Sequence, residues 1–282
     1  MNAKVKTARL SIISNSLLIV LKLFVGILSG SVSIISEAIH SSMDLVAALI
    51  AFFSVSVSDT PPDTRHPYGH GKVENISGVI EAILIFAAAI WIIYEAVKRL
   101  LGEEIVLESI WLGSIVMIIS AIVNTLVSRR LYKVARETNS VALEADALHL
   151  KTDVYTSVGV ALGLVLILIT DIKWLDPVVA ISVALIILKE SYILLKRAFS
   201  PLLDTAWDDE EIEDLEKKLN LMNVNYHDLR TRIAGNYRFI DIHVEIPEDE
   251  SVGNAHHYCD MIEEELTKQY ENLNVTIHVE PS

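Results

Sequence analysis

The chain has 282 residues, of which 52% are hydrophobic, so it is long enough for one membrane domain and one small soluble domain. Its net charge of −14 comes from residues 204–282, which hold 6 Lys and Arg against 20 Asp and Glu, because residues 1–203 hold 17 of each sign. This acidic region argues against nucleic acid as a partner and favours cations, and the single Cys259 excludes an internal disulfide.

Six apolar segments follow one another in the first part of the chain, and each approaches the ~20 residues that a helix needs to cross a bilayer. They predict an all-α, six-helix transmembrane domain over residues 1–203, in the lipid bilayer of the cell (plasma or inner) membrane. The segments cover residues 9–29, 33–57, 76–97, 108–128, 141–170 and 177–198.

Basic residues between the spans gather on one side, which predicts that both termini are cytoplasmic. The other side holds Lys98, Arg99 and Lys173. The side with more basic residues holds Lys4, Lys6, Arg9, Arg65, Lys72, Arg129, Arg130, Lys133, Arg136, Lys196 and Arg197.

Two spans carry the same pattern, H-x-x-x-D, as His40 with Asp44 and His149 with Asp153. Ionisable groups inside a membrane are costly and are functional candidates for that reason. A spacing of four residues places both side chains on one helix face, so the two helices together offer two imidazoles and two carboxylates. This set suits a tetrahedral divalent site, with Zn²⁺ as the natural occupant. The alternative, that each pair only stabilises the bundle, is weakened because the pattern occurs twice.

Other polar residues in the spans are interpreted as support for this site. Glu37, Asp146 and Lys151 are expected to pair with charges around the ligands, and Asn15 and Asn124 to form hydrogen bonds between helices. Because an ordinary imidazole titrates near about pH 6.5, protons and metal compete for the same nitrogen. Exchange of one for the other across the membrane is therefore a hypothesis that this site allows.

The connection after the second span contains Asp63, His66 and His70 close to Gly69 and Gly71. Two glycines let a loop turn tightly, so these three side chains can converge on one ion. The alternative is a polar loop without a ligand.

Residues 204–282 change character and predict a small cytoplasmic domain. An acidic amphipathic helix is followed by two alternating strands, a second helix and a third strand, the order αββαβ. This order indicates a compact α+β domain similar to ferredoxin-like metallochaperones. Five of the nine histidines lie here, which favours metal binding over scattered surface histidines; they are His227, His243, His256, His257 and His278, with Glu280 beside the last.

These motifs together resemble the cation diffusion facilitator family, and the match extends over essentially the whole chain. Beyond the paired H-x-x-x-D helices, the resemblance is carried by residues 66–72 (HPYGHGK), 202–204 (LLD), 227–232 (HDLRTR) and 277–281 (IHVEP). It implies a homodimer that exchanges divalent metal for protons by alternating access. It implies a transport site at His40, Asp44, His149 and Asp153, and a loop site at Asp63, His66 and His70. It further implies an ion-pair network with Lys72 and Asp204, and a dinuclear cytoplasmic site drawn from His227, His243, His256, His278 and Glu280.

The chain departs from the family pattern at two positions that bear on the metal. Bacterial members related to this chain carry Asp where it has His40, and the two-His, two-Asp version is typical of zinc-selective members. Glu280 stands where the family pattern has Asp, so the cytoplasmic site is expected to differ or to bind one ion weakly. We therefore expect Zn²⁺ as transported and regulatory ion, with Cd²⁺, Fe²⁺, Mn²⁺ or Co²⁺ as alternatives.

Two other classes of function compete with a metal exporter. Glu37 and His40 form a Glu-x-x-His, a ligand type of di-iron helical bundles, but the second copy would need Glu at Asp146. A membrane-anchored metal sensor would use the cytoplasmic histidines but has no use for His and Asp inside two spans. The sequence therefore favours a secondary transporter over an enzyme.

Overall fold

The computed structural model describes residues 3–29, 32–101, 110–170, 172, 174–270 and 272–282. The start of the fourth predicted span, residues 108 and 109, and Lys173 lie outside the described residues. The chain divides into two compact units, residues 1–199 and 200–282.

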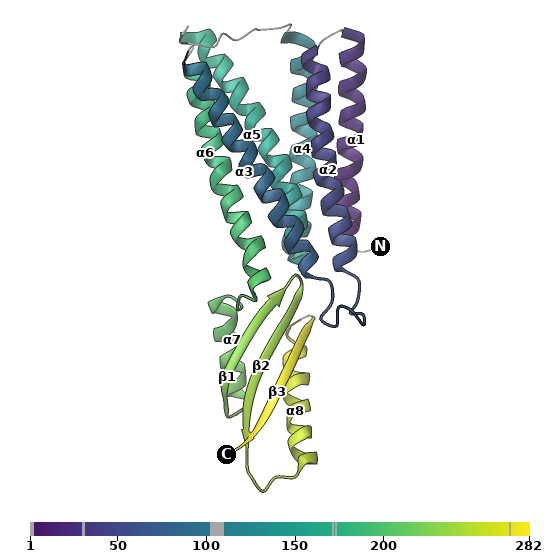
Figure 1. The fold of residues 1–282 in the computed structure, drawn as a ribbon, viewed down its shortest axis with the longest axis vertical. Coiled ribbons are helices and arrows are strands. Elements are labelled where there is room, and N and C mark those ends of the chain that lie inside the picture. Colours follow the sequence, from purple (N-terminus) through teal and green to yellow (C-terminus); the bar gives the residue numbers. More distant parts are fainter. Residues whose placement is uncertain (1–2, 30–31, 102–109, 171, 173, 271) are drawn as a thin grey trace. The chain divides into compact units, whose positions relative to one another are not determined.

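Six long helices form the first unit, as the apolar segments predict (Figure 1). Their 25 to 30 residues give lengths of about 38–45 Å at ~1.5 Å per residue, enough for a ~30 Å hydrocarbon layer. They are α1 (Ala3–Ser29), α2 (Val32–Ser58), α3 (Lys72–Leu100), α4 (Ile110–Thr138), α5 (Val141–Thr170) and α6 (Leu175–Phe199).

Several helices continue beyond the apolar segments that predict them. The fourth segment ends at residue 128, whereas α4 continues through a basic stretch to Thr138. Hydropathy marks only the part of a helix that lies in lipid, while backbone hydrogen bonding continues into water.

Among the described residues, five helices, α1, α2, α3, α4 and α6, are long and apolar enough to cross a membrane. The first half of α5 carries Glu144, Asp146, Lys151 and Asp153. Polar groups on a spanning helix must face the interior of the bundle. Asp146 is fully buried, which agrees with that requirement.

Small residues allow the helices to approach closely, which is typical of membrane bundles. A Cβ atom at Gly78 of α3 would lie 2.7 Å from Val141 Cγ1 of α5 and 3.1 Å from Ala198 Cβ of α6. Only glycine permits this contact, and it brings α3 against both α5 and α6.

A buried charge network joins four helices around Glu74 of α3. The Lys4 ammonium of α1 lies 2.9 Å from Glu74 Oε1 and 2.6 Å from Asp59 Oδ1. Ser58 Oγ of α2 donates to Glu74 Oε1 at 2.7 Å, and Ser140 Oγ donates to Glu74 Oε2. Because the buried carboxylate is fully hydrogen-bonded, this network stabilises the arrangement of the helix ends rather than opposing it.

The second unit has the predicted order αββαβ (Figure 1). It begins with a 3₁₀ turn, Ser200–Leu203. The antiparallel pair β1–β2 extends into a three-stranded sheet in which β2 and β3 run parallel, so the order is β1-β2-β3. The elements that follow the turn are α7 (Asp209–Leu221), β1 (Tyr226–Ala234), β2 (Tyr237–Ile246), α8 (Val252–Thr267) and β3 (Leu273–Pro281).

Alternation along the strands gives this sheet one apolar and one polar face. Ile240, Ile242 and Val244 of β2 are buried in a core with Leu215 of α7 and Ile262 of α8. Both helices therefore cover the same face. Residues of the other parity, including His227, His243 and His278, lie on the opposite face.

Candidate metal sites

The predicted intramembrane residues meet where α2 and α5 pack together. His40, Asp44 and Asp153 each offer a ligand atom, and these three atoms all lie within 4.8 Å of one another. His149 joins this group through Asp44, since its Nε2 atom lies 3.1 Å from Asp44 Oδ1. Asp44 is only 6% exposed, so the carboxylate is held inside the bundle. Two imidazoles, from His40 and His149, and the Asp153 carboxylate thus lie around the Asp44 carboxylate.

A cavity of about 220 Å³ gives access to this group from one side. Its walls come from α1, α2, α4 and α5, and they include the parts of α1 and α2 that run from the level of Asp44 towards the α1–α2 connection. The lining residues are Asn15, Leu18, Lys22, Glu37, His40, Ser41, Asp44, Met117, Ser120, Ala121, Asn124, Asp153, Thr156 and Ser157.

Two asparagines hold the carboxylate-bearing helices, as predicted. Asn124 Nδ2 of α4 donates to Asp153 Oδ2 at 3.4 Å, and Asn15 Nδ2 of α1 donates to the backbone carbonyl of Asp44 at 3.4 Å. Contacts of this kind orient ligating groups and are part of the chemistry of a metal site.

Lys22 of α1 is a charged residue of this cavity that the sequence did not lead us to expect. Its Nζ atom donates to Ser41 Oγ at 2.8 Å and to Glu37 Oε2 at 3.2 Å. Its signal in the sequence is a lysine in the middle of the first apolar span. Glu37, which the di-iron alternative needs as a ligand, is therefore engaged by an ammonium group.

On the opposite side of the site, the bundle is closed around two acidic side chains. Glu81 of α3 and Asp146 of α5 are both 0% exposed. Asp146 Oδ1 accepts a hydrogen bond from Ser11 Oγ at 3.2 Å. Asp146 Oδ2 and both Glu81 oxygens have no hydrogen-bond partner among the described residues. Sequence reasoning missed Glu81, because its complete burial depends on contacts between helices that are distant along the chain.

The loop before α3 brings its three predicted residues together. His66 Nδ1 lies 3.3 Å from Asp63 Oδ1, His70 Nε2 lies 3.5 Å from Asp63 Oδ2, and the two histidine nitrogens are 3.1 Å apart. Gly69, with φ of 83°, supplies the left-handed turn between them. One carboxylate and two imidazoles in this geometry fit a divalent transition metal.

The Asp63 carboxylate is preorganised as an anion by its own loop. Hydrogen bonds from the backbone N–H groups of His66 and Arg65, at 2.6 and 2.8 Å, lower the pKa of Asp63 below its ordinary value of 3.8. These bonds favour the charged form that a metal ligand needs.

A row of histidines crosses the polar face of the sheet in the second unit. The strand register places His227 opposite His243, and His243 opposite His278. Glu280 reaches across this row, with one oxygen 3.2 Å from His227 Nε2 and the other 3.0 Å from His243 Nδ1. His278 Nε2 lies 3.6 Å from the same carboxylate. Of these residues, His227, His243 and Glu280 form a further group of suitable metal ligands, on the solvent side of the sheet.

Other predicted residues lie elsewhere. His256 of α8 is 77% exposed at its side chain, pairs with Asp260 at 3.7 Å, and is not a member of the His227–His243–Glu280 group. Asp204 Oδ1 lies 3.5 Å from Arg232 Nη1 within the second unit, and Lys72 begins α3 in the first. Asp228 and Glu245, which sequence reasoning did not select, lie 3.8 Å from His243 Nε2 and 3.4 Å from His227 Nδ1.

Comparison with known proteins places both units in one family. The model of the cation efflux transmembrane domain matches residues 8–203, and that of the cation efflux protein cytoplasmic domain matches residues 207–282. An uncharacterized transporter of Synechocystis sp. is 36% identical over 264 residues, which cover 93% of this chain and 85% of the relative. The cation-efflux pump FieF of Shewanella oneidensis is 33% identical over 281 residues, covering 97% and 93%.

A solved structure, the metal-bound C-terminal domain of the CzcD transporter from Thermotoga maritima, matches with 33% identity and a TM-score of 0.25, covering 27% of this chain and 94% of that chain. The paired intramembrane His and Asp residues stand within the matched transmembrane region, and the histidine row stands within the matched cytoplasmic region. The chain belongs to the cation diffusion facilitator family and is a divalent metal cation efflux transporter.

Proposed function

We propose that this protein exports Zn²⁺ from the cytoplasm in exchange for protons, using His40, Asp44, His149 and Asp153 as the transport site. The observation that carries this proposal is the meeting of His40, Asp44 and Asp153 within 4.8 Å, with His149 hydrogen-bonded to Asp44, beside a polar cavity in the bundle. Two imidazoles beside two carboxylates favour Zn²⁺ over harder cations such as Mn²⁺, which prefer oxygen ligands.

The shape of the site supports alternating access. The cavity opens along the halves of α1 and α2 that lead to their connection, while Ser11, Glu81 and Asp146 are fully buried on the opposite side. If the protein lies in a plasma or inner membrane with both termini on the cytoplasmic side, the cavity opens away from the cytoplasm, and this arrangement is outward-facing. Export then requires a second arrangement in which the closed side opens to the cytoplasm and the cavity closes.

The contact between His149 and Asp44 supports coupling to protons. In this arrangement a proton shared between His149 Nε2 and Asp44 Oδ1 occupies the atoms that bind the metal. A low pH outside therefore displaces Zn²⁺ from the outward-facing site, and a higher cytoplasmic pH frees the ligands for the next ion. Lys22 at the cavity wall adds a positive charge that opposes rebinding of the released cation.

The remaining sites are proposed to bind Zn²⁺ as a regulatory ion in a homodimer. The loop residues Asp63, His66 and His70 and the histidine row of the second unit lie in regions that we assign to the cytoplasm. Metal bound at the row neutralises the acidic second unit and so reduces repulsion between two copies of it. An ion-pair network with Lys72 and Asp204 belongs to the same proposal.

Transport of Zn²⁺ across a vesicle membrane tests the proposal. The parent, Asp153→Ala and Ser182→Ala are reconstituted in liposomes with a pH difference, and Zn²⁺ is followed with a trapped dye. Asp153→Ala is expected to lose flux by about 100-fold or more, since even groups that only orient ligands contribute 10–100-fold to metal affinity. Ser182, which is exposed and bonds to its own helix carbonyl, serves as the matched control.

Each result of this assay has a defined meaning. Parent flux that depends on the pH difference and disappears in Asp153→Ala supports a proton-coupled exporter. Parent flux that is insensitive to the pH difference contradicts the proton coupling. A folded parent that moves no ion contradicts transport and favours a sensor. Competition by Cd²⁺, Fe²⁺, Mn²⁺ and Co²⁺ in the same vesicles determines whether Zn²⁺ is preferred.

A further inference from the structure

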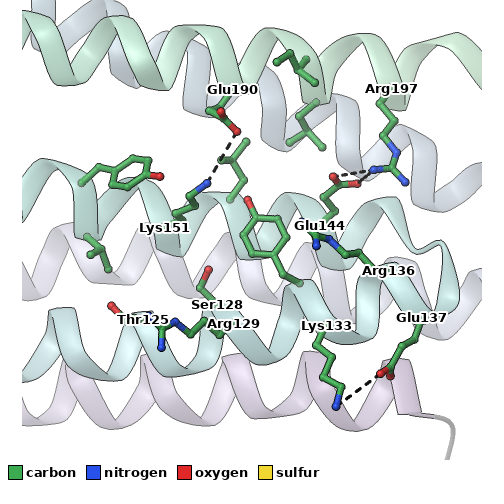
Figure 2. A pocket seen from close by; sticks show the side chains of 16 residues that line it. Thr125, Ser128, Arg129, Lys133, Arg136, Glu137, Glu144, Lys151, Glu190 and Arg197 are labelled. Atoms are coloured by element: carbon green, nitrogen blue, oxygen red, sulfur yellow. Dashed lines mark hydrogen bonds and ion pairs between the residues drawn. The ribbon is translucent and has the colours of Figure 1, made fainter.

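A second and larger cavity of about 810 Å³ lies in the first unit, over α5 and between α4 and α6 (Figure 2). It shares no lining residue with the cavity of the transport site. Lys151 and Glu144 enter it from α5, whereas His149 and Asp153 of the same helix belong to the transport site. Its volume is in the range of pockets that hold an organic molecule.

The lining of this cavity has an excess of positive charge. Three of its basic residues pair with its three acidic ones: Arg197 with Glu144 at 2.8 Å, Lys133 with Glu137 at 3.8 Å, and Lys151 with Glu190 at 4.0 Å. Five basic and three acidic residues leave a formal charge of +2. An excess of cations repels a divalent metal, so the cavity is unsuited to be a route for the transported ion.

Two arginines account for the excess. Arg129 and Arg136 of α4 line the cavity, and neither forms an ion pair among the described residues. Their spacing, with Lys133 between them at i+4, places all three basic groups on one helix face. Figure 2 shows their side chains on the same side of the cavity, below the pairs that link α5 to α6. Guanidinium groups in this setting are typical ligands of phosphate.

Part of the cavity wall is apolar. Leu148 and Val154 of α5 and Ile193 and Leu194 of α6 line it, and the Tyr132 ring lies 5.6 Å from the Lys151 ammonium. A ligand that fits both parts combines an anionic headgroup with a hydrocarbon chain.

We propose that this cavity binds an anionic phospholipid, with its phosphate among Arg129, Lys133 and Arg136 and an acyl chain against the apolar wall. The basic groups lie towards the C-terminal ends of α4 and α6. In the orientation of the proposed function, on which this step rests, these ends face the cytoplasmic leaflet, where anionic lipids attract basic residues. A lipid held there bridges α4 and α6 beside the site-bearing α5.

Lipid retention in native mass spectrometry tests this inference on the full chain. The protein in neutral detergent is incubated with phosphatidylglycerol or with phosphatidylcholine of the same acyl chains, and bound lipid is counted. The parent is expected to retain phosphatidylglycerol preferentially. Arg129→Gln with Arg136→Gln is expected to lose at least about tenfold in this retention, since a single charge-assisted contact already contributes about that factor.

The matched control also removes two positive charges, one from α4 and one from α6, at positions outside the cavity, as Arg130→Gln with Lys196→Gln. Both of these side chains are exposed and neither lines the cavity. The control is expected to retain the parent preference. Arg129→Lys with Arg136→Lys keeps the charge but not the forked donor, and it should retain more phosphatidylglycerol than the glutamine pair.

Three results would overturn the inference. They are equal retention of the two lipids by the parent, equal losses in the glutamine pair and its control, and displacement of phosphatidylglycerol by inorganic phosphate, which would indicate a soluble anion. Size-exclusion profiles establish whether each variant is folded. If the glutamine pair is not folded, the retention of phosphatidylglycerol by the lysine pair is compared with that of the parent instead. Because binding is read without flux, a failed transport assay leaves this result unaffected.

Discussion

At the scale of single residues, Asp44 organises the proposed transport site. Its carboxylate contacts His149 directly and lies within 4.8 Å of ligand atoms of His40 and Asp153, while its backbone carbonyl accepts from Asn15. Hydrogen bonds from α1 and α5 to Asp44 of α2 thus hold the candidate ligands in place. Side chains that touch ligands without binding metal are therefore expected to affect affinity.

Replacing Asn124 by alanine removes the donor to Asp153 Oδ2 and frees that carboxylate to rotate. We expect about a tenfold rise in the Zn²⁺ concentration needed for half-maximal flux, because a group that orients a ligand contributes 10–100-fold to affinity. Thr125→Val is the matched control, since Thr125 Oγ1 bonds to its own helix at Ala121 O. Equal flux curves for the two variants would contradict a positioning role for Asn124.

At the scale of elements, the loop between α2 and α3 is a preformed ligand set. Asp63 accepts from two backbone N–H groups of its own turn, and Gly69 makes the turn that returns His70 to His66. The loop geometry is thus established by local hydrogen bonds, and metal binding adds to a structure already close to the required one.

The pH dependence of the loop site follows from this geometry. The pKa of Asp63 is lowered from 3.8 by the backbone hydrogen bonds, so this carboxylate keeps its charge until the pH falls below the ordinary carboxyl range. Because protons compete with metal for imidazole nitrogens, a site with two histidine ligands is expected to bind metal more weakly as the pH falls.

Zn²⁺ titrations of the parent and of His66→Ala with His70→Ala, in detergent at several pH values, isolate this site by difference. The difference signal is expected to weaken as the pH falls through the imidazole range. A signal that persists until the carboxyl range, near pH 4, would show that the histidines are not the ligands.

At the scale of the whole molecule, the two units have separate cores, and each has its own candidate metal ligands. The second unit buries its own set of apolar side chains from α7, β2 and α8, and its histidine row lies on the face that this core leaves uncovered. Metal binding at the row can therefore be measured apart from the membrane domain.

We expect Zn²⁺ to raise the unfolding temperature of residues 200–282 expressed alone. A ligand at 100 times its Kd adds about 2.7 kcal/mol to the free energy of unfolding. His243→Ala should abolish this increase, because His243 stands in the centre of the row. His256→Ala should retain it, since His256 pairs with Asp260 outside the row. Loss of the increase in His256→Ala would place that residue in the site.

Much of the molecule could be predicted because its signals are local. The six spans follow from runs of apolar residues, and the αββαβ order follows from alternation and helical spacing over a few residues. His40 and Asp44 share one face of their helix, and so do His149 and Asp153, because each pair is spaced four residues apart. Asn15 and Asn124 were likewise predicted, because an amide inside a span requires a partner in another helix.

The sequence by itself determined the membrane helices, the class of the second unit and the candidate ligands, since these depend on neighbours along the chain. Only the tertiary structure decided that Lys22 contacts Ser41, that Glu81 of α3 is fully buried, and that His243 lies between His227 and His278. The physical reason is that helix packing and strand register bring together residues far apart in sequence, and a rotation of one helix or a slip of one strand would exchange their neighbours.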